Sequence, residues 1–244
     1  MEIKMKNKSE LAFEQEVVDY LTHIGGVKQW EYRPEIKTTE QLWENFKAII
    51  ERNNQARLER PLSVTEFNQV KKVITAISSP YQAGQFLYGV NGVSEVEVDL
   101  DDDRHVFLTI FDQAKVGGGT TSYQVVNQIE RKKVVDGKPN RRFDVTLLIN
   151  GLPIIQIELK KALHSTRESL NQMEQYIAEK QYSDIFSTVQ ILIAMTPYEI
   201  KYMANTKLEN FNRAFAFNWQ NEGNAQPVRS WKTFADKVLS IPMA

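Results

Sequence analysis

A predicted β-hairpin over residues 143–160 limits the fold of this chain more than any other segment. Apolar side chains alternate along its first arm, Asn150-Gly151 supplies a tight turn, and alternation returns along the second arm. Strand side chains repeat every two residues, so Glu158 and Lys160 share the face opposite the apolar set. Counting back across the turn places Asp144 within one residue of Glu158 on the facing arm. The apolar residues are Phe143, Val145, Leu147 and Ile149, then Ile155, Ile157 and Leu159.

Two carboxylates and one ammonium are therefore expected to meet at the open end of the hairpin. Mg²⁺ prefers hard oxygen ligands, usually takes one or two carboxylates and keeps several waters. Such a site activates a water and neutralises charge on a phosphodiester. We expect Asp144 and Glu158 to hold Mg²⁺ with the backbone carbonyl of Leu159. Lys160 is expected to orient or help deprotonate the attacking water. The alternative is a surface Glu-Lys pair on a half-exposed strand, which is the common reading of Glu-x-Lys alone.

Composition excludes several other classes of protein. The 244 residues are 42% hydrophobic, which predicts one substantial core, and no apolar run approaches the roughly 18 residues of a membrane span. The chain has no cysteine, which excludes disulfides and thiolate metal sites, and its N-terminus lacks the apolar core of a signal peptide; both favour a cytoplasmic protein. Gly117-Gly118-Gly119 lacks the Gly-Lys-Ser/Thr ending of a phosphate loop, so no nucleotide is expected there.

A local run of positive charge leads into Asp144. The net charge of −1 argues against general coating of nucleic acid, so phosphate contact requires local patches. Residues 131–142 hold six basic side chains against one acidic one, and Lys160 and Lys161 add charge at the other end of the hairpin. The run is either a solvated loop or a phosphate contact, and its junction with the carboxylates favours the contact. The six are Arg131, Lys132, Lys133, Lys138, Arg141 and Arg142.

Helical spacing predicts three helices before the strands and a fourth after the hairpin. In the fourth, Gln172 and Tyr176 stand four residues apart and so share a face. Ser165 and Glu168 match the capping-box pattern at its start. Pro80 is expected to close the helical region at about 40–80. The helices are expected over residues 8–23, 40–55, 63–78 and 165–182.

Period-two alternation predicts strands on both sides of the hairpin. The near-continuous apolar run at 186–195 predicts a central strand covered on both faces. After residue 211, aromatic and polar residues mix without clear periodicity, which suggests that this tail packs on something else. These patterns predict an α/β fold with a central sheet flanked by helices. The strands outside the hairpin are expected over residues 90–100, 106–110, 123–129, 186–195 and 198–203.

Several short segments together resemble one known family. They are Arg142-Phe143-Asp144-Val145, Asn150-Gly151-Leu152-Pro153, Ile157-Glu158-Leu159-Lys160, Gln172 with Tyr176, and upstream Pro61–Phe67, Ser79-Pro80-Tyr81 and Val125-Val126-Asn127-Gln128. The chain is similar to the N-terminal nuclease domain of the R (HsdR) subunit of type I restriction enzymes. This family lies within the PD-(D/E)xK, or RecB-like, nuclease superfamily. The resemblance covers about residues 9–205 and implies a restriction-endonuclease-like core with a mixed sheet and an N-terminal helical region.

The resemblance implies Mg²⁺-dependent cleavage of double-stranded DNA, with Asp144, Glu158 and Lys160 as catalytic residues. In the family, methyltransferase and specificity subunits supply sequence recognition, and motor domains of the R subunit hydrolyse ATP to translocate DNA. This chain has no Gly-x-x-x-x-Gly-Lys-Ser/Thr, so ATP is expected only in the full-length subunit. We expect residues 1–205 to form the nuclease domain and residues 206–244 to begin a linker towards absent motor domains. Two alternatives remain open, a DNA-binding or assembly module with a silent nuclease site and a free-standing repair nuclease.

The resemblance also implies residues that support the site. Gln172 and Tyr176 resemble the Gln-x-x-x-Tyr pair of RecB-like members, which supports the active site and contacts DNA. RecB-like members often add a metal-binding carboxylate from the first helix, and Glu14 is the candidate here. Its alternative is an ordinary exposed helix glutamate. Further DNA contacts are expected from Arg141, Arg142 and Lys161.

Overall fold

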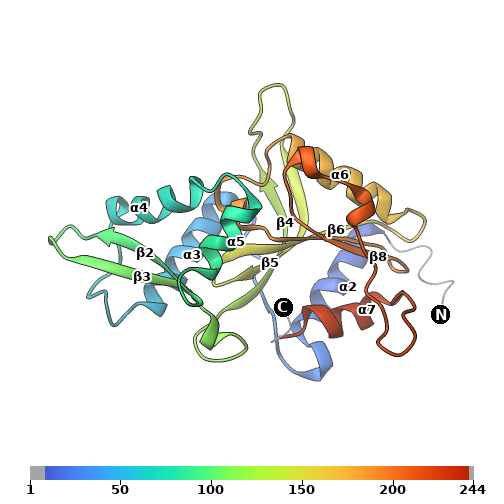
Figure 1. Cartoon of the computed structure of the whole chain (residues 1–244), viewed down its shortest axis with the longest axis horizontal. Coiled ribbons are helices and arrows are strands. Elements are labelled where there is room, and N and C mark those ends of the chain that lie inside the picture. Colours follow the sequence, from blue (N-terminus) through green and yellow to red (C-terminus); the bar gives the residue numbers. More distant parts are fainter. Residues whose placement is uncertain (1–8, 242–244) are drawn as a thin grey trace.

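Six strands form one mixed sheet, and the predicted hairpin lies at its centre (Figure 1). The computed structural model describes residues 9–241. The strand order is β1-β4-β5-β6-β7-β8, in which β1–β4 and β6–β7 are parallel pairs and the other neighbours are antiparallel. This confirms the predicted α/β fold with a restriction-endonuclease-like core. The strands are β1 (Glu31–Tyr32), β4 (Tyr123–Arg131), β5 (Arg141–Ile149), β6 (Leu152–Leu159), β7 (Ile191–Met195) and β8 (Ile200–Ala204).

Two more strands form a separate antiparallel sheet, which extends to the left in Figure 1. They are β2 (Val93–Asp99) and β3 (His105–Asp112), joined by a turn that holds Asp101, Asp102 and Asp103. Their inward side chains pack in the same apolar cluster as α3 and α4. The two strands predicted from alternation after residue 90 are therefore confirmed.

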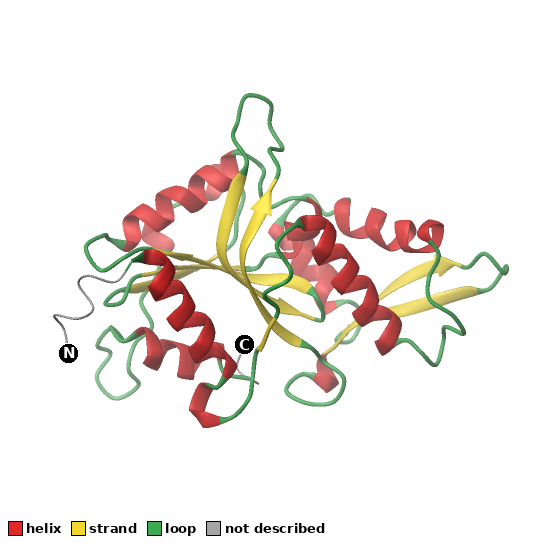
Figure 2. Ribbon diagram, turned by 180° about the vertical axis from the view of Figure 1, so that it is seen from behind, coloured by secondary structure: helices red, strands yellow, loops and turns green. Residues whose placement is uncertain are grey.

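Helices cover both faces of the large sheet (Figures 1 and 2). The apolar cluster on one face includes side chains of α2 and α7, and the cluster on the other face includes α3 and α6. No helix within residues 9–241 is long and apolar enough to cross a membrane. The helices are α2 (Glu10–Thr22), α3 (Thr39–Asn53), α4 (Val64–Thr75), α5 (Pro80–Tyr88), α6 (Thr166–Ala178) and α7 (Trp231–Phe234).

The C-terminal segment packs against the first helix. The indole Nε1 of buried Trp30 donates to the backbone oxygen of Leu239 at 2.7 Å. Trp231 of α7 meets Phe13 of α2 edge to face, with ring centroids 5.7 Å apart. The assignment of residues 206–244 to a linker stays a prediction, but its helix α7 belongs to the apolar cluster under α2.

The register of the hairpin places the two carboxylates opposite each other. Val145 pairs with Ile157, so Asp144, one residue earlier on β5, faces the position of Glu158, one residue later on β6. This is the alignment expected from the Asn-Gly turn. The hairpin therefore places both acidic side chains at one end of the sheet.

Phe143 departs from the predicted alternation, because it does not share a face with Val145. Phe143 belongs to the apolar cluster on the α6 side of the sheet, whereas Val145 belongs to the cluster on the α2 side. On the facing strand, Gln128 has a φ of 56° between the pairs Asn127–Val145 and Ile129–Phe143. Such a left-handed residue costs about 1–2 kcal/mol and interrupts the alternation of both strands. The prediction for Phe143 was wrong because the local sequence does not reveal this turn of the backbone.

One predicted helix end and one predicted capping contact were also wrong. Pro80 does not close the helical region but begins α5, with Ser79 as its N-cap. Proline suits a first helical position because the N–H that it lacks has no partner inside the helix there. Ser165 precedes α6 without any side-chain capping bond, and the Glu168 carboxylate instead lies 2.6 Å from Nδ1 of His164.

The apolar run at 186–195 is only partly a strand. Its first part belongs to a 3₁₀ turn, Asp184–Thr188, and β7 occupies the second part. Within the turn, the hydroxyl of Thr188 donates to the backbone oxygens of Pro153 and Ile185 at 2.8 and 3.0 Å. The buried position of this run was expected, but its turn depends on a contact with the distant hairpin.

Gly151 in the hairpin turn has no room for a side chain. Its φ is 82°, and a Cβ at this position would lie 2.9 Å from the Cα of Phe46 in α3. We expect Gly151→Ala to lower the free energy of unfolding by about 1–3 kcal/mol, because the backbone conformation and the contact both oppose a side chain. Urea denaturation followed by circular dichroism measures the change.

Gly118→Ala is the control, since a Cβ at Gly118 would meet nothing within 4 Å. It should alter the free energy of unfolding by less than about 0.5 kcal/mol. Equal stability of the two variants would contradict this account of the turn.

Candidate active site

The three residues singled out on the hairpin meet at one end of the central strands. Asp144 Oδ2 accepts a hydrogen bond from the backbone N–H of Leu159 at 2.8 Å, which ties β5 to the end of β6. Lys160 Nζ lies 3.8 Å from Glu158 Oε1 and 3.6 Å from Glu10 Oε1. The structure thus brings Asp144, Glu158 and Lys160 together, as the hairpin register predicts.

Both carboxyl groups are buried, which makes their ionisation costly. Asp144 is 8% exposed and Glu158 is 0% exposed. Burial raises the pKa of Asp144, an effect that the N–H of Leu159 and the charge of Lys160 oppose. Burial followed by the charge of Asp144 raises the pKa of Glu158 well above its ordinary value. Because the Asp144 and Glu158 carboxyls face each other across the two strands, they do not ionise independently, and the pair favours a cation placed between them.

The Glu158 carboxylate has no hydrogen-bond donor within the described part of the chain. Both Oε1 and Oε2 are buried without a hydrogen-bond partner, and Lys160 Nζ, 3.8 Å from Oε1, forms only an ion pair. Buried polar atoms are almost always satisfied, so a buried carboxylate without a hydrogen-bond donor is suited to bind a cation. Two carboxylates plus the backbone oxygen of Leu159 are oxygen donors of the kind that Mg²⁺ takes. Within residues 9–241, no three acidic or histidine side chains gather as a ready metal cluster. The donor set fits Mg²⁺ that keeps several waters.

Glu14 is buried close enough to Asp144 for that carboxyl's charge to act on it, and it is not an ordinary exposed helix glutamate. It is 2% exposed. Asn127 Nδ2 donates to its Oε1 at 2.8 Å, and Gln128 Nε2 donates to its Oε2. Burial raises the pKa of Glu14, the bond from Asn127 opposes that rise, and the charge of Asp144 adds to it. Asn127 and Gln128 were not predicted as site residues, although their segment is one of those that carry the family resemblance.

Gln172 and Tyr176 face the end of β5 from α6. Gln172 Nε2 donates to the Tyr176 hydroxyl, which in turn donates to the backbone oxygen of Arg142 at 3.4 Å. The Tyr176 ring packs against Phe143, with centroids 5.1 Å apart. Burial and then the charge of Glu158 raise the pKa of Tyr176, so its phenol stays protonated. The pair therefore braces the strand that carries Asp144.

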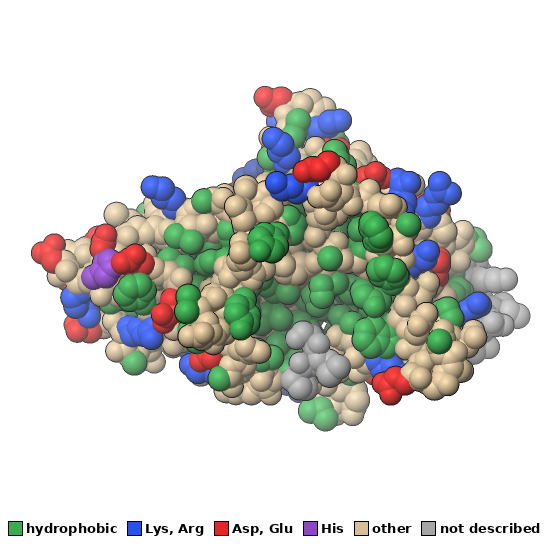
Figure 3. All heavy atoms as spheres, viewed as in Figure 1, with side chains coloured by type: hydrophobic (Ala, Val, Ile, Leu, Met, Phe, Trp, Pro, Cys, Tyr) green, Lys and Arg blue, Asp and Glu red, His purple; other side chains and the backbone are tan. Residues whose placement is uncertain are grey.

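The basic run divides into buried and exposed residues. Arg131 is buried, and its guanidinium donates to the backbone oxygens of Gln181 and Ser183 at 3.0 and 3.2 Å. Arg141 forms a two-pronged ion pair with Glu179, so it is not free to contact a ligand without breaking that pair. The others are exposed on the β4–β5 loop, which projects at the top of Figures 1 and 3, or beside the site. They are Lys132, Lys133, Lys138, Arg142 and Lys161.

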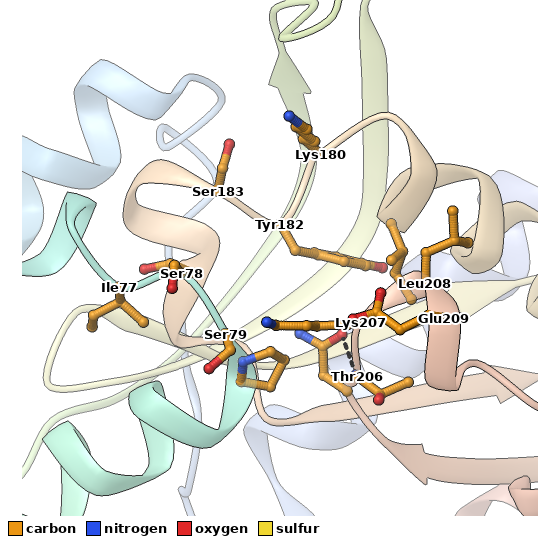
Figure 4. Close-up of a pocket in the computed structure, with 14 residues that line it drawn as sticks. Ile77, Ser78, Ser79, Lys180, Tyr182, Ser183, Thr206, Lys207, Leu208 and Glu209 are labelled. Carbon is orange, nitrogen blue, oxygen red and sulfur yellow. Dashed lines mark hydrogen bonds between the residues drawn. The ribbon is translucent and has the colours of Figure 1, made fainter.

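The site lies outside two cavities of the fold. One, of about 420 Å³, lies between the start of α5 and the segment after β8, with Tyr182 and Lys207 among its lining residues (Figure 4). The other, of about 700 Å³, lies between α3 and α4. None of the three hairpin residues lines either cavity. A site at the end of a sheet, rather than inside a deep cavity, suits a large substrate that lies across the surface.

Comparisons with known proteins show which family the chain is similar to. The family model described as type I restriction enzyme R protein N terminus matches residues 7–211. The type I restriction enzyme SauMSSORF170P endonuclease subunit of Staphylococcus aureus (strain MSSA476) is 28% identical over 236 residues, which are 96% of this chain and 23% of that protein. The type I restriction enzyme EcoprrI endonuclease subunit of Escherichia coli is 27% identical over 229 residues, 89% of this chain and 66% of that protein. The chain thus spans about a quarter of the length of the staphylococcal relatives.

The raised pKa of Glu158 predicts how stability depends on pH. The folded state keeps a proton that the unfolded chain loses above the ordinary pKa of 4.5. The free energy of unfolding should therefore fall as pH rises above that value, by up to about 1.4 kcal/mol per pH unit. Below it, Glu158 is protonated in both states and contributes no slope. Glu158→Gln removes this titration and should flatten the decline, as measured by urea denaturation without divalent cations.

Glu222→Gln is the control, because Glu222 is exposed in the loop before α7. Its stability should follow the wild-type pH dependence. Parallel curves for Glu158→Gln and wild type would contradict the assignment of a buried, proton-holding carboxyl.

Proposed function

This chain belongs to the family of type I restriction enzyme R protein N termini, and from that premise we propose that it is the nuclease part of such a subunit. Its reaction would be Mg²⁺-dependent endonucleolytic cleavage of phosphodiester bonds in double-stranded DNA. The observation that carries the proposal is the fully buried Glu158 carboxylate, which has no hydrogen-bond donor and lies beside Asp144 and Lys160. A carboxylate in this state is costly to the fold unless a cation compensates it.

Each residue of the site has a distinct task in this proposal. Asp144, Glu158 and the backbone oxygen of Leu159 hold the cation, and the N–H of Leu159 fixes the Asp144 carboxylate for that purpose. When bound, Mg²⁺ supplies charge neutralisation at the phosphate and a more acidic water. Lys160, on the solvent side of Glu158, would use its ammonium to orient the attacking water and to offset negative charge that develops on the phosphate.

The exposed basic residues support a DNA path towards the site. Arg142 directly precedes Phe143 and Asp144 on β5, and Lys161 follows Lys160. Neither Arg142 nor Lys161 forms an ion pair within residues 9–241. Contacts from such side chains go to the phosphate backbone, bind without sequence preference and weaken with salt. Sequence recognition would then have to come from outside this chain.

We infer the wider context from the family. The relatives are named as endonuclease subunits, so the chain would act in a complex whose methyltransferase and specificity subunits recognise the site. ATP-driven translocation would belong to motor domains of the full-length subunit. Residues 1–205 would form the nuclease domain, and the following segment, including α7, would lead towards those motors.

Cleavage of plasmid DNA tests the proposal. We expect Asp144→Ala and Lys160→Ala to reduce Mg²⁺-dependent nicking at least about 100-fold, because each removes a group that acts on the reacting phosphate. Agarose-gel conversion of supercoiled to open circular plasmid measures the rate. The assay uses this chain alone and, if it is silent, the complete assembly that contains it.

Glu222→Ala is the matched control and should cut at the wild-type rate. Wild-type nicking by both Asp144→Ala and Lys160→Ala would exclude the hairpin as the active site. Mg²⁺ titration adds an independent criterion. DNA affinity that is unaffected by Asp144→Ala, together with no Mg²⁺ binding, would indicate a binding module with a silent site.

The DNA path is tested by the salt dependence of affinity. Arg142→Ala and Lys161→Ala should each weaken binding of a duplex of any sequence and reduce the slope of log K against log salt by about 1. Fluorescence anisotropy across a salt series measures this. Lys28→Ala, at an exposed position in the segment between α2 and β1, is the control and should leave the slope unchanged. An unchanged slope in all three variants would remove these residues from the DNA path.

A further inference from the structure

A polar network extends from Glu14 away from the hairpin. Asn127 and Gln128 are neighbours on β4, and their side-chain amides donate to different oxygens of Glu14. Lys37 Nζ donates to the backbone oxygen of Asn127 at 2.7 Å and to its Oδ1 at 2.6 Å. The Tyr32 hydroxyl donates to the same Oδ1 at 3.0 Å. None of the four residues around Glu14 has a task in the cleavage chemistry proposed above.

The network fixes the orientation of the Asn127 amide. An ammonium has only donors, so the atom of Asn127 that meets Lys37 must be the carbonyl oxygen. The amide nitrogen of Asn127 is then left to donate to Glu14. Lys37 itself is held by the sheet, because the N–H of Glu130 on β4 donates to the Lys37 backbone oxygen at 2.8 Å. The Lys37 ammonium therefore sets the direction of a hydrogen bond that ends on Glu14.

The backbone of Gln128 makes the double contact possible. In a regular strand, consecutive side chains point to opposite faces, so residues 127 and 128 would not reach the same carboxylate. Gln128 has a φ of 56°, and among the described residues no other non-glycine inside a strand has a positive φ. Such strain persists only where the surroundings enforce it, and it gathers at functional sites. Here it brings two adjacent amides onto one buried carboxylate.

We propose that Lys37, Asn127 and Gln128 are positioning residues that hold Glu14 beside Asp144 and thereby set the affinity of the site for divalent cations. The inference rests on the proposed function, because it gives the network a task only if the hairpin carboxylates bind a cation. Outer partners that orient the groups of a metal site typically change its affinity by about 10–100-fold when they are removed.

Gln128→Gly tests the inference, because glycine accepts the positive φ and removes the amide. Lys180→Gly is the matched control, since Lys180 has a φ of 55° at the end of α6. We expect Gln128→Gly to weaken Mn²⁺ binding about tenfold or more by isothermal titration calorimetry, with the cooperative thermal melt retained. Lys180→Gly should bind Mn²⁺ within about twofold of wild type. If Gln128→Gly loses its cooperative melt, Gln128→Met removes the donor while keeping the side-chain bulk.

A double-mutant cycle with Glu14→Gln shows whether Gln128 acts through Glu14. In the Glu14→Gln background, Gln128→Gly should add less than about a twofold loss of Mn²⁺ affinity, because its target is gone. A folded Gln128 variant with wild-type affinity, or full additivity in the cycle, would overturn the inference. Asp144→Ala separates the two hypotheses. If Asp144→Ala binds Mn²⁺ with wild-type affinity, the proposed function is refuted. If Asp144→Ala loses affinity but the Gln128 variant keeps it, only the positioning role of Gln128 is refuted.

Discussion

The hydrogen bond from the N–H of Leu159 to the Asp144 carboxylate is the contact on which the candidate site depends. It uses a backbone donor at the end of β6 and thus fixes where β5 stands relative to the residues that follow. With this bond in place, Glu158 faces Asp144 and Lys160 leaves the sheet next to both. A slip of one residue would send every side chain of an arm to the opposite face. The apolar clusters on both faces of the sheet oppose such a slip.

The position of the site follows from where those clusters meet. Phe143 and Tyr176 belong to the cluster on one face, and Val145 and Ile157 belong to the cluster on the other. The strained backbone at Gln128 lies where the pattern changes between them. The acidic residues thus lie between the two apolar clusters, where little water reaches them. Burial is therefore the first cause of the raised pKa of Asp144, Glu158 and Glu14. Burying these carboxylates destabilises the fold, and a bound cation would offset that destabilisation.

Positive charge in the sequence is a weaker guide to function than its position in the fold. Arg131 and Arg141 lie at either end of the basic loop, yet both are used within the structure. Arg131 also lies over the ring of Phe186, with the guanidinium carbon 4.7 Å from the centroid. A buried guanidinium needs several acceptors, and the backbone oxygens of Gln181 and Ser183 and the hydroxyl of Thr39 supply them. Of the exposed remainder, Lys132 pairs with Glu40 and Lys133 with Asp136, so within residues 9–241 only Lys138 and Arg142 of the run are exposed without an ion pair.

Local pattern by itself determined the hairpin, its turn, the pairing of Asp144 with Glu158 and the helical face shared by Gln172 and Tyr176. These follow from side-chain periods of two and 3.6 and from an Asn-Gly turn, which neighbouring residues decide. Tertiary structure alone decided that Phe143 changes face, that Glu14 is buried and that Asn127 and Gln128 turn together onto it. The contacts of Glu14 join residues more than a hundred positions apart in the chain, and the change of face at Phe143 follows the backbone turn at Gln128 on the facing strand, so no local period encodes them. They arise because α2 and β4 must satisfy each other's polar groups once both are removed from water.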